Sequence, residues 1–182
     1  THDILMGQPV ERAPGAVTPI WGACAGCVLL RRRAFDEAGG FDERFFVELD
    51  DVDFAFRARW LGYDFLLVPD ARARHHRQSN AGHKTVRKLL WVRRNGLWIA
   101  MKDLPPGMDW SIMAYRAQRD LLMTAHYLRR RQAGAVARAW GQAFRGWPEM
   151  RRRRRALLAR ARRTPGQMRA DLERFDTDRV GA

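Results

Sequence analysis

The sequence has few cysteines, no long hydrophobic run and no glycine-rich phosphate-binding loop. Its least polar stretch, Val17 to Leu30, is 14 residues long and contains Thr18 and Pro19, whereas a membrane-spanning helix needs about 20 apolar residues. No basic and then apolar leader follows Thr1. We therefore expect no transmembrane helix, and we interpret the chain, which does not begin with Met, as part of a longer one.

The two cysteines, Cys24 and Cys27, have the C-x-x-C spacing of a redox pair or of half a zinc site. A common zinc site needs a second such pair, but His75 and His76 are adjacent and about 50 residues away. Cys27 leads into the apolar Val28-Leu29-Leu30 rather than into a helix. The favoured interpretation is a buried strand over 24–30 that carries two reduced thiols, which also fits a reducing cytosol.

Basic residues are distributed very unevenly along the chain. The 182 residues are 46% hydrophobic and include seven Trp, which predicts a folded domain and excludes global disorder. Residues 1–109 carry 16 basic and 14 acidic side chains, whereas residues 110–182 carry 18 Arg, no Lys and only 6 acids. This pattern indicates a nearly neutral globular body and a basic segment that is attracted to nucleic acid or to an anionic membrane surface.

Local signals predict alternating helices and strands, and therefore an α/β fold. Acids begin and Gly62 ends a helix over 50–61, and the apolar run Phe65 to Val68 follows as a buried strand. A short helix over 33–38 ends at Gly39-Gly40, and helical spacing of apolar residues extends over 84–102. Beyond the break at 105–107, Arg-rich helices are expected, with Arg151 to Arg155 too dense for a buried face.

Three acids crowd the start of the helix over 50–61. Asp50 and Asp51 cannot both cap it, so one of them can point elsewhere and act as a general base. Asp53 and Arg57 have the i, i+4 spacing of a helix-surface ion pair. The alternative interpretation of the cluster is N-capping plus that ion pair, without chemistry.

His75 follows a predicted strand and is the best candidate for a metal ligand. A neutral imidazole there can bind a divalent cation together with carboxylates from another segment. The alternative is a surface histidine between Arg74 and Arg77.

The order of these motifs resembles that of family 2 glycosyltransferases, most closely their bacterial rhamnosyltransferase-like branch. The resemblance covers about residues 22–100 and rests on four motifs in one order: Arg31-Arg32-Arg33-Ala34-Phe35, Gly39-Gly40-Phe41-Asp42-Glu43-Arg44-Phe45-Phe46, Asp50-Asp51-Val52-Asp53-Phe54-Ala55-Phe56-Arg57, and Gly62-Tyr63 with Val68-Pro69-Asp70-Ala71 and His75-His76.

The resemblance implies a GT-A (Rossmann-like) fold that transfers a sugar from a nucleotide-diphosphate sugar to a glycan or lipid-linked acceptor with inversion. It implies Asp51 as the catalytic base, Asp50 and Trp21 beside the substrate, and His75 as a ligand of Mn²⁺ or Mg²⁺. Residues 1–104 would then be the C-terminal, acceptor-side part of the catalytic domain. The donor-binding N-terminal half, with its D-x-D motif and further metal ligands, has no counterpart in this sequence, so the chain alone is expected to be inactive.

Residues 105–182 would form a basic extension of amphipathic helices. Its interleaved arginines and apolar residues suit an anionic leaflet, which predicts a peripheral cytoplasmic protein at the inner face of the membrane. The rival interpretation is a nucleic-acid- or membrane-binding helical module without catalysis. Nucleic acid is not the expected partner, because the first half carries no nucleic-acid-binding motif.

Overall fold

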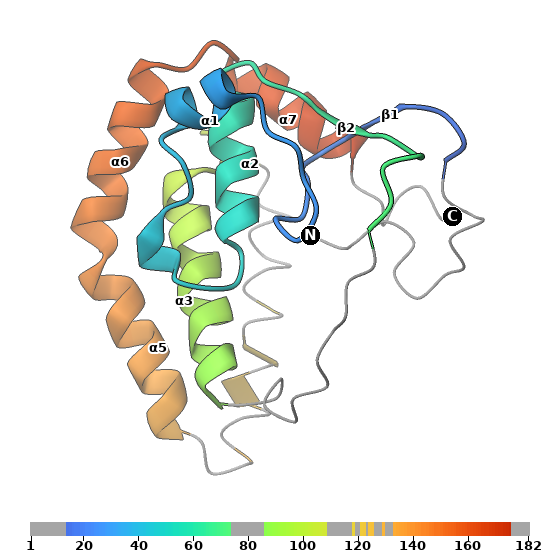
Figure 1. The fold of residues 1–182 in the computed structure, drawn as a ribbon. Helices are drawn as coiled ribbons and strands as arrows, with labels where there is room; N and C mark the ends of the chain where they lie inside the picture. Colours follow the sequence, from blue (N-terminus) through green and yellow to red (C-terminus); the bar gives the residue numbers. More distant parts are fainter. Residues whose placement is uncertain are drawn as a thin grey trace. The chain divides into compact units, whose positions relative to one another are not determined.

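The computed structural model describes residues 14–73, 86–108, 118, 121–122, 124–125, 129 and 133–175. Their elements, in chain order, are β1 (Thr18–Ile20), α1 (Arg32–Ala38), η2 (Glu43–Phe45), α2 (Asp50–Trp60), β2 (Phe65–Leu67), α3 (Val86–Lys102), α5 (Ala133–Arg145), α6 (Trp147–Ala159) and α7 (Pro165–Arg174) (Figure 1). They belong to two compact units. Unit 1 is drawn from residues 1–41, 51–77 and 161–182, and unit 2 from 42–50 and 78–160.

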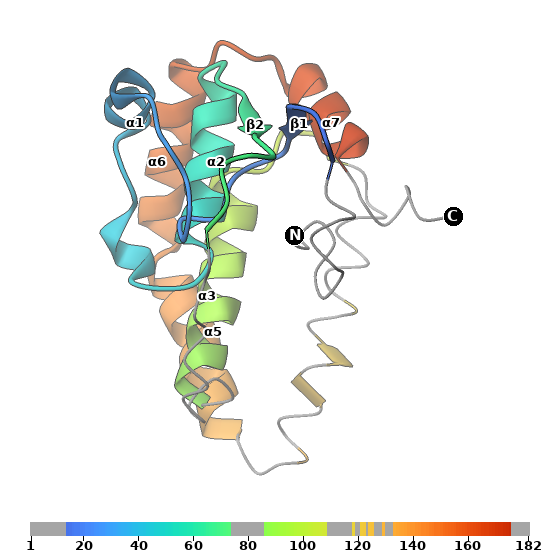
Figure 2. The same ribbon diagram turned by 45° about the vertical axis from the view of Figure 1, so that its right-hand side comes forward.

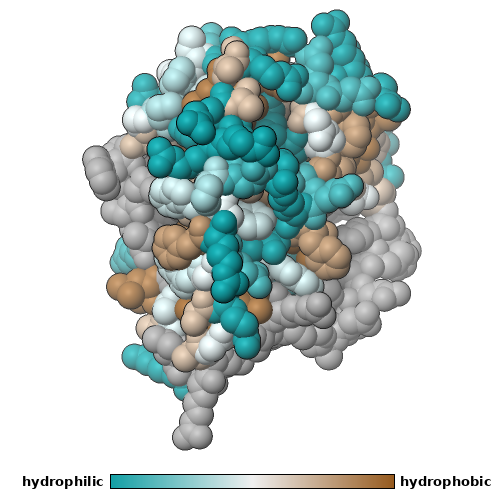
Figure 3. Space-filling view, turned by 90° about the vertical axis from the view of Figure 1, so that its left-hand side faces the viewer, coloured by the Kyte–Doolittle hydropathy of each residue, from teal (hydrophilic) through white to brown (hydrophobic). Residues whose placement is uncertain are grey.

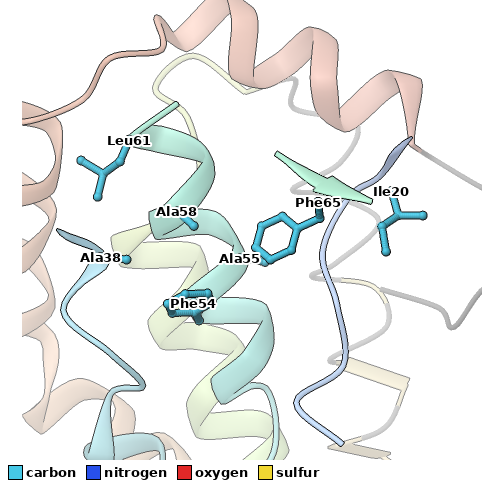
Figure 4. Packing of buried hydrophobic residues seen from close by; sticks show 7 residues of the cluster. All are labelled: Ile20, Ala38, Phe54, Ala55, Ala58, Leu61 and Phe65. Atoms are coloured by element: carbon cyan, nitrogen blue, oxygen red, sulfur yellow. The ribbon is translucent and has the colours of Figure 1, made fainter. Parts of the chain in front are cut away.

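Unit 1 is built around α2 and a small antiparallel sheet. Strand β1 pairs with β2 in the register Thr18↔Leu67 to Ile20↔Phe65. Two strands alone are marginally stable in water, so the sheet depends on the packing of its inner side chains against α2. The resulting core joins α1, α2 and both strands, as Figure 4 shows, and consists of Ile20, Ala38, Phe54, Ala55, Ala58, Leu61 and Phe65.

Sequence signals located the ends of the unit 1 helices well. Helix α1 ends at Gly39, whose φ of 80° is left-handed, and the turn after α2 contains Gly62 with φ 88°. Glycine adopts these angles without the steric cost that a Cβ imposes. The predicted helices over 33–38 and 50–61 and the predicted strand after them are therefore confirmed, each to within about two residues.

The predicted strand over 24–30 is wrong. Residues 25–27 form a turn, in which the Cys27 amide donates to the Cys24 carbonyl oxygen at 3.2 Å, and residues 28–30 are irregular. Both cysteines are exposed, and Leu29 is 99% exposed. Apolar composition alone suggested burial, but the turn leaves this run without a neighbouring strand.

Unit 2 is helical, with α3 packed against both α5 and α6 (Figures 1 and 2). Small residues of α5, such as Ala139 and Ala143, are fully buried there. The Trp98 indole of α3 donates to the Ala143 carbonyl oxygen at 3.2 Å, and a Cβ added at Gly146 would lie 2.6 Å from the Trp98 Nε1 atom. Small side chains therefore allow the close approach of these helices.

The predicted α/β class is confirmed in part, since the described residues form mostly helices and one two-stranded sheet. The division of the chain into part of a catalytic domain over residues 1–104 and a basic helical extension over 105–182 stays a prediction. Among the described residues, no helix is both long and apolar enough to cross a membrane.

Candidate active site

Asp51 lies in the first turn of α2 and is held at both carboxylate oxygens. Its Oδ1 accepts from the Val52 amide at 2.8 Å, and its Oδ2 accepts from the Ala25 amide at 3.2 Å. The side chain is only partly buried. A carboxylate has about four lone-pair positions, so two donors orient Asp51 and leave acceptor capacity toward solvent. These are the properties that a general base requires.

The segment after β1 runs along α2 and determines what lies near Asp51. The Trp21 ring meets Phe56 edge to face with centroids 4.9 Å apart. One residue later, a Cβ added at Gly22 would lie 2.6 Å from the Ala55 Cβ. Because the Ala25 amide reaches Asp51 at the start of the helix, residues 21–25 lie antiparallel to α2. Trp21 thus packs against α2 at Phe56, five residues along that helix from the predicted base Asp51.

Trp21 has an unused polar group. Its Nε1 atom is buried, and the described residues provide no hydrogen-bond partner for it. A buried indole N–H normally finds an acceptor. Because this N–H is shielded from solvent, it does not itself support the substrate-contacting role that the sequence resemblance implied, and that role stays a prediction.

Asp53 has a different environment from Asp51, although only one residue separates them. It is completely buried and pairs with Arg57 at 2.7 Å. Arg57 also donates to the carbonyl oxygens of Ala38 and Gly40. The predicted i, i+4 ion pair is confirmed, but it lies in the interior and ties α2 to the end of α1. Asp53 therefore has a structural role and is not a candidate base.

Arg59 is a buried arginine that the sequence analysis did not single out. It donates to the carbonyl oxygens of Ile20 and Trp21, both at 2.6 Å. It also pairs with Asp171 at 3.1 Å, and its guanidinium lies 4.7 Å from the Trp21 ring centroid. Burial lowers the pKa of Arg59, while Asp171 and Asp64 oppose that shift. No local pattern marks this residue, because its partners are distant in sequence.

Arginines of α6 also serve the structure. Arg154 donates to the carbonyl oxygens of Lys102 (3.1 Å) and Leu104 (2.6 Å), and Arg153 pairs with Asp42 at 2.9 Å. The sequence predicts that Arg151 to Arg155 are too dense for a buried face, and none of the five is buried. Arg153 and Arg154 are nevertheless only partly exposed, because polar partners within unit 2 satisfy them.

Glu149 and Asp42, the acids that pair with arginines of α6, are stabilised in their ionised form. Hydrogen bonds from Arg153, Arg44 and Arg152 lower the pKa of Glu149 to about 2. Burial alone would raise the pKa of Asp42, but the charges of Lys102 and Arg153 lower it overall. Depressed carboxyl pKa values stabilise the fold above the unfolded-state pKa, and this stabilisation is lost as the pH falls toward the folded-state value.

Not every predicted site residue can be placed. Asp50 is the first residue of α2, next to Asp51, and is partly buried. The proposed metal ligand, His75, lies outside the described residues. The part of the chain that the structure describes contains no group of three or more His, Cys, Asp or Glu side chains that could hold a metal ion. The described residues therefore do not by themselves form a metal site.

Comparison of the sequence with known proteins identifies its family. The family model described as "Glycosyl transferase family group 2" matches residues 1–144. The chain belongs to the family 2 glycosyltransferases. The resemblance found in the sequence motifs is thereby confirmed.

Two relatives are informative about the branch of the family. The chain is 32% identical over 130 residues to an N-acetylglucosaminyl-diphospho-decaprenol L-rhamnosyltransferase of Mycobacterium tuberculosis, covering 66% of this chain and 40% of that protein. It is 38% identical over 87 residues to the O-antigen biosynthesis protein RfbC of Myxococcus xanthus, covering 42% of this chain and 7% of that protein. The chain thus spans less than half the length of either relative. No solved structure matches it.

Proposed function

We propose that this glycosyltransferase chain is the C-terminal, acceptor-side part of a GT-A catalytic domain, over residues 1–104, followed by a basic helical extension over 105–182. The whole enzyme would transfer a sugar from a nucleotide-diphosphate sugar to a glycan or lipid-linked acceptor. The mycobacterial relative, whose name specifies a rhamnosyl donor group and a polyprenol-linked acceptor, supports L-rhamnose and a lipid-linked acceptor as the first candidates.

The observation that carries this proposal is the oriented but accessible carboxylate of Asp51. In an inverting transfer, Asp51 takes the proton of the acceptor hydroxyl as its oxygen attacks the sugar C1 from the face opposite the diphosphate. The new C1–O bond forms while the bond from C1 to the phosphate oxygen breaks, and its electron pair leaves with the nucleoside diphosphate. Asp50 and Trp21 are proposed to hold the acceptor beside Asp51.

A divalent cation, Mn²⁺ or Mg²⁺, would offset the charge on the departing diphosphate when bound. The described residues supply no cluster for it, so its ligands would come from His75 and from the donor-binding half. Asp51 is proposed to transfer the proton, and Asp50 and Trp21 are proposed to position the acceptor.

The test is a transfer assay with the complete native gene product, a nucleotide-diphospho-L-rhamnose donor and an N-acetylglucosaminyl-diphospho-polyprenol acceptor. We expect transfer with an inverted anomeric configuration of the product, read by NMR. A product that retains the donor configuration would contradict the single-displacement mechanism.

In the same assay, His75→Ala should raise the cation concentration needed for half-maximal rate, and an unchanged titration would remove His75 from the metal site.

The basic extension is proposed to contact an anionic membrane, which would place the enzyme at the inner, cytoplasmic face. Arg151 and Arg155 of α6 are exposed, and the neighbouring aromatic residues Phe144 and Trp147 are 55% and 41% exposed. Figure 3 looks at the side on which α5 and α6 lie, and hydrophilic residues cover its upper and central part. A helix that carries exposed arginines and an exposed tryptophan suits the interface between lipid headgroups and acyl chains.

Vesicle sedimentation distinguishes this contact from the rival module that binds nucleic acid without catalysis. We expect the protein to bind phosphatidylglycerol vesicles, with Arg151→Glu/Arg155→Glu reducing the bound fraction several-fold, because each basic residue near an anionic surface contributes about 1 kcal/mol. Arg31→Glu/Arg32→Glu, at two exposed positions of unit 1, is the control that changes the net charge by the same amount. Equal vesicle binding by wild type and double variant would contradict the proposal, and tight, salt-sensitive binding to DNA instead would favour the rival.

A further inference from the structure

A strained loop leads directly into the acidic pair at the start of α2. Phe46, Glu48 and Leu49 have φ angles of 61°, 69° and 65°. Residues other than glycine rarely adopt positive φ, and the surroundings must hold them there. Three such residues within four positions immediately precede Asp50, so the backbone has an unusual and tightly determined entry into the helix.

One buried side chain of α3, Asn95, holds this loop. Its Nδ2 atom donates to the carbonyl oxygens of Phe45 at 3.0 Å, Val47 at 2.9 Å and Glu48 at 2.7 Å. All three neighbours are acceptors, so only the amide nitrogen can face them. Asn95 is completely buried, and its Oδ1 accepts from Arg94 at 3.0 Å.

Other residues on the same face of α3 contact the same segment. Lys88 pairs with Glu48 at 2.8 Å, and the Trp91 and Phe46 rings lie 5.2 Å apart. Lys88, Trp91 and Asn95 are spaced by three and then four residues, which places them in one row along the helix. The row continues through Trp98, whose ring lies 5.8 Å from that of Phe45, to Lys102, which pairs with Asp42 at 3.4 Å.

The two apolar residues that follow the buried Phe45 gain little from burial. Phe46 remains 74% exposed and Val47 37% exposed. Strain at a site that contributes little apolar burial indicates that the conformation itself is required. Its immediate consequence along the chain is the position at which α2 begins, and therefore the position of Asp50 and Asp51.

We propose that Asn95 is a positioning residue for transfer: by fixing the loop over 45–48 it sets the start of α2 and so aims the Asp51 carboxylate. This inference rests on the proposed role of Asp51. A general base must be placed accurately, because a displacement of about 1 Å costs about 100-fold in rate. The three hydrogen bonds from Asn95 fix the backbone that leads directly into the acidic pair.

The test compares Asn95→Asp with Gln142→Glu in the complete gene product, using the transfer assay described above. Both substitutions replace an amide by a carboxylate, but Gln142 is exposed on α5, away from the loop. Asn95→Asp conserves shape and turns a donor into an acceptor that faces three carbonyl oxygens. We expect kcat to fall by about 100-fold with an unchanged KM for the donor, at a temperature at which circular dichroism shows the variant folded, while Gln142→Glu behaves as wild type.

The outcomes separate this inference from the proposed function. A folded Asn95→Asp variant with wild-type kcat overturns the positioning role if Asp51→Asn is inactive, whereas activity in Asp51→Asn overturns the proposed function itself. If Asn95→Asp does not fold, the test uses Lys88→Met instead. The ion pair between Lys88 and Glu48 contacts the same loop but lies near the surface, so its loss should be tolerated by the fold. A several-fold loss of kcat at constant donor KM in Lys88→Met supports the inference, and wild-type kcat contradicts it.

Discussion

Asp51→Asn is expected to reduce transfer by about 10²–10⁴-fold, the range that general base catalysis contributes, while binding of the nucleotide-diphosphate sugar survives. An asparagine keeps the size of the side chain and one oxygen that can accept the Ala25 or Val52 amide, so the start of α2 should persist. It cannot take the proton of the acceptor hydroxyl. The measurement is kcat from the transfer assay, together with donor affinity from isothermal titration calorimetry.

Asp36→Asn is the matched control for this experiment. Asp36 lies on α1 in the same unit and pairs at the surface with Arg32, at 2.7 Å. Exposed pairs of this kind contribute about 0.2–1 kcal/mol, so the control should retain activity. Turnover in Asp51→Asn within tenfold of wild type would remove Asp51 as the base, and loss of donor affinity would show instead that Asp51 acts in binding.

Arg59→Met is expected to destabilise the protein by about 2–6 kcal/mol, because each of the two carbonyl oxygens left without its buried donor costs about 1–3 kcal/mol. The variant leaves the carbonyl oxygens of Ile20 and Trp21 without their buried donor and Asp171 without one of its cations. For a chain of this size, each kcal/mol lowers Tm by about 2–4 °C, so thermal unfolding should show a decrease of roughly 10 °C.

Two further variants define what Arg59 does. Arg59→Lys should recover only part of the loss, because an ammonium group cannot reproduce the planar fork that serves several acceptors and stacks on Trp21. Arg32→Met removes an exposed arginine, 88% accessible, from the same unit and should change stability by less than about 1 kcal/mol. A Tm for Arg59→Met within 2 °C of wild type would refute the structural role.

Signals that act over a few residues predicted much of unit 1. Acids at the start of α2, Gly39 after α1 and Gly62 after α2 set helix ends through hydrogen bonds and φ angles within one turn. The Asp53–Arg57 pair follows from helical spacing alone. The motif order was sufficient to recognise the family, and the family comparison confirms it. The roles of Asp51, Asp50, Trp21 and His75 stay predictions.

The sequence by itself determined where α1 and α2 form and end and which acids lie at the start of α2, because these properties depend on neighbours in the chain. Only the tertiary structure decided the direction in which polar groups point. It showed residues 24–27 as an exposed turn, Arg153 and Arg154 turned toward partners in unit 2, and Asn95 donating to the loop before Asp50. The contacts of Arg153, Arg154 and Asn95 join segments that are distant in the chain, and a buried polar group must find its partner wherever the fold supplies one.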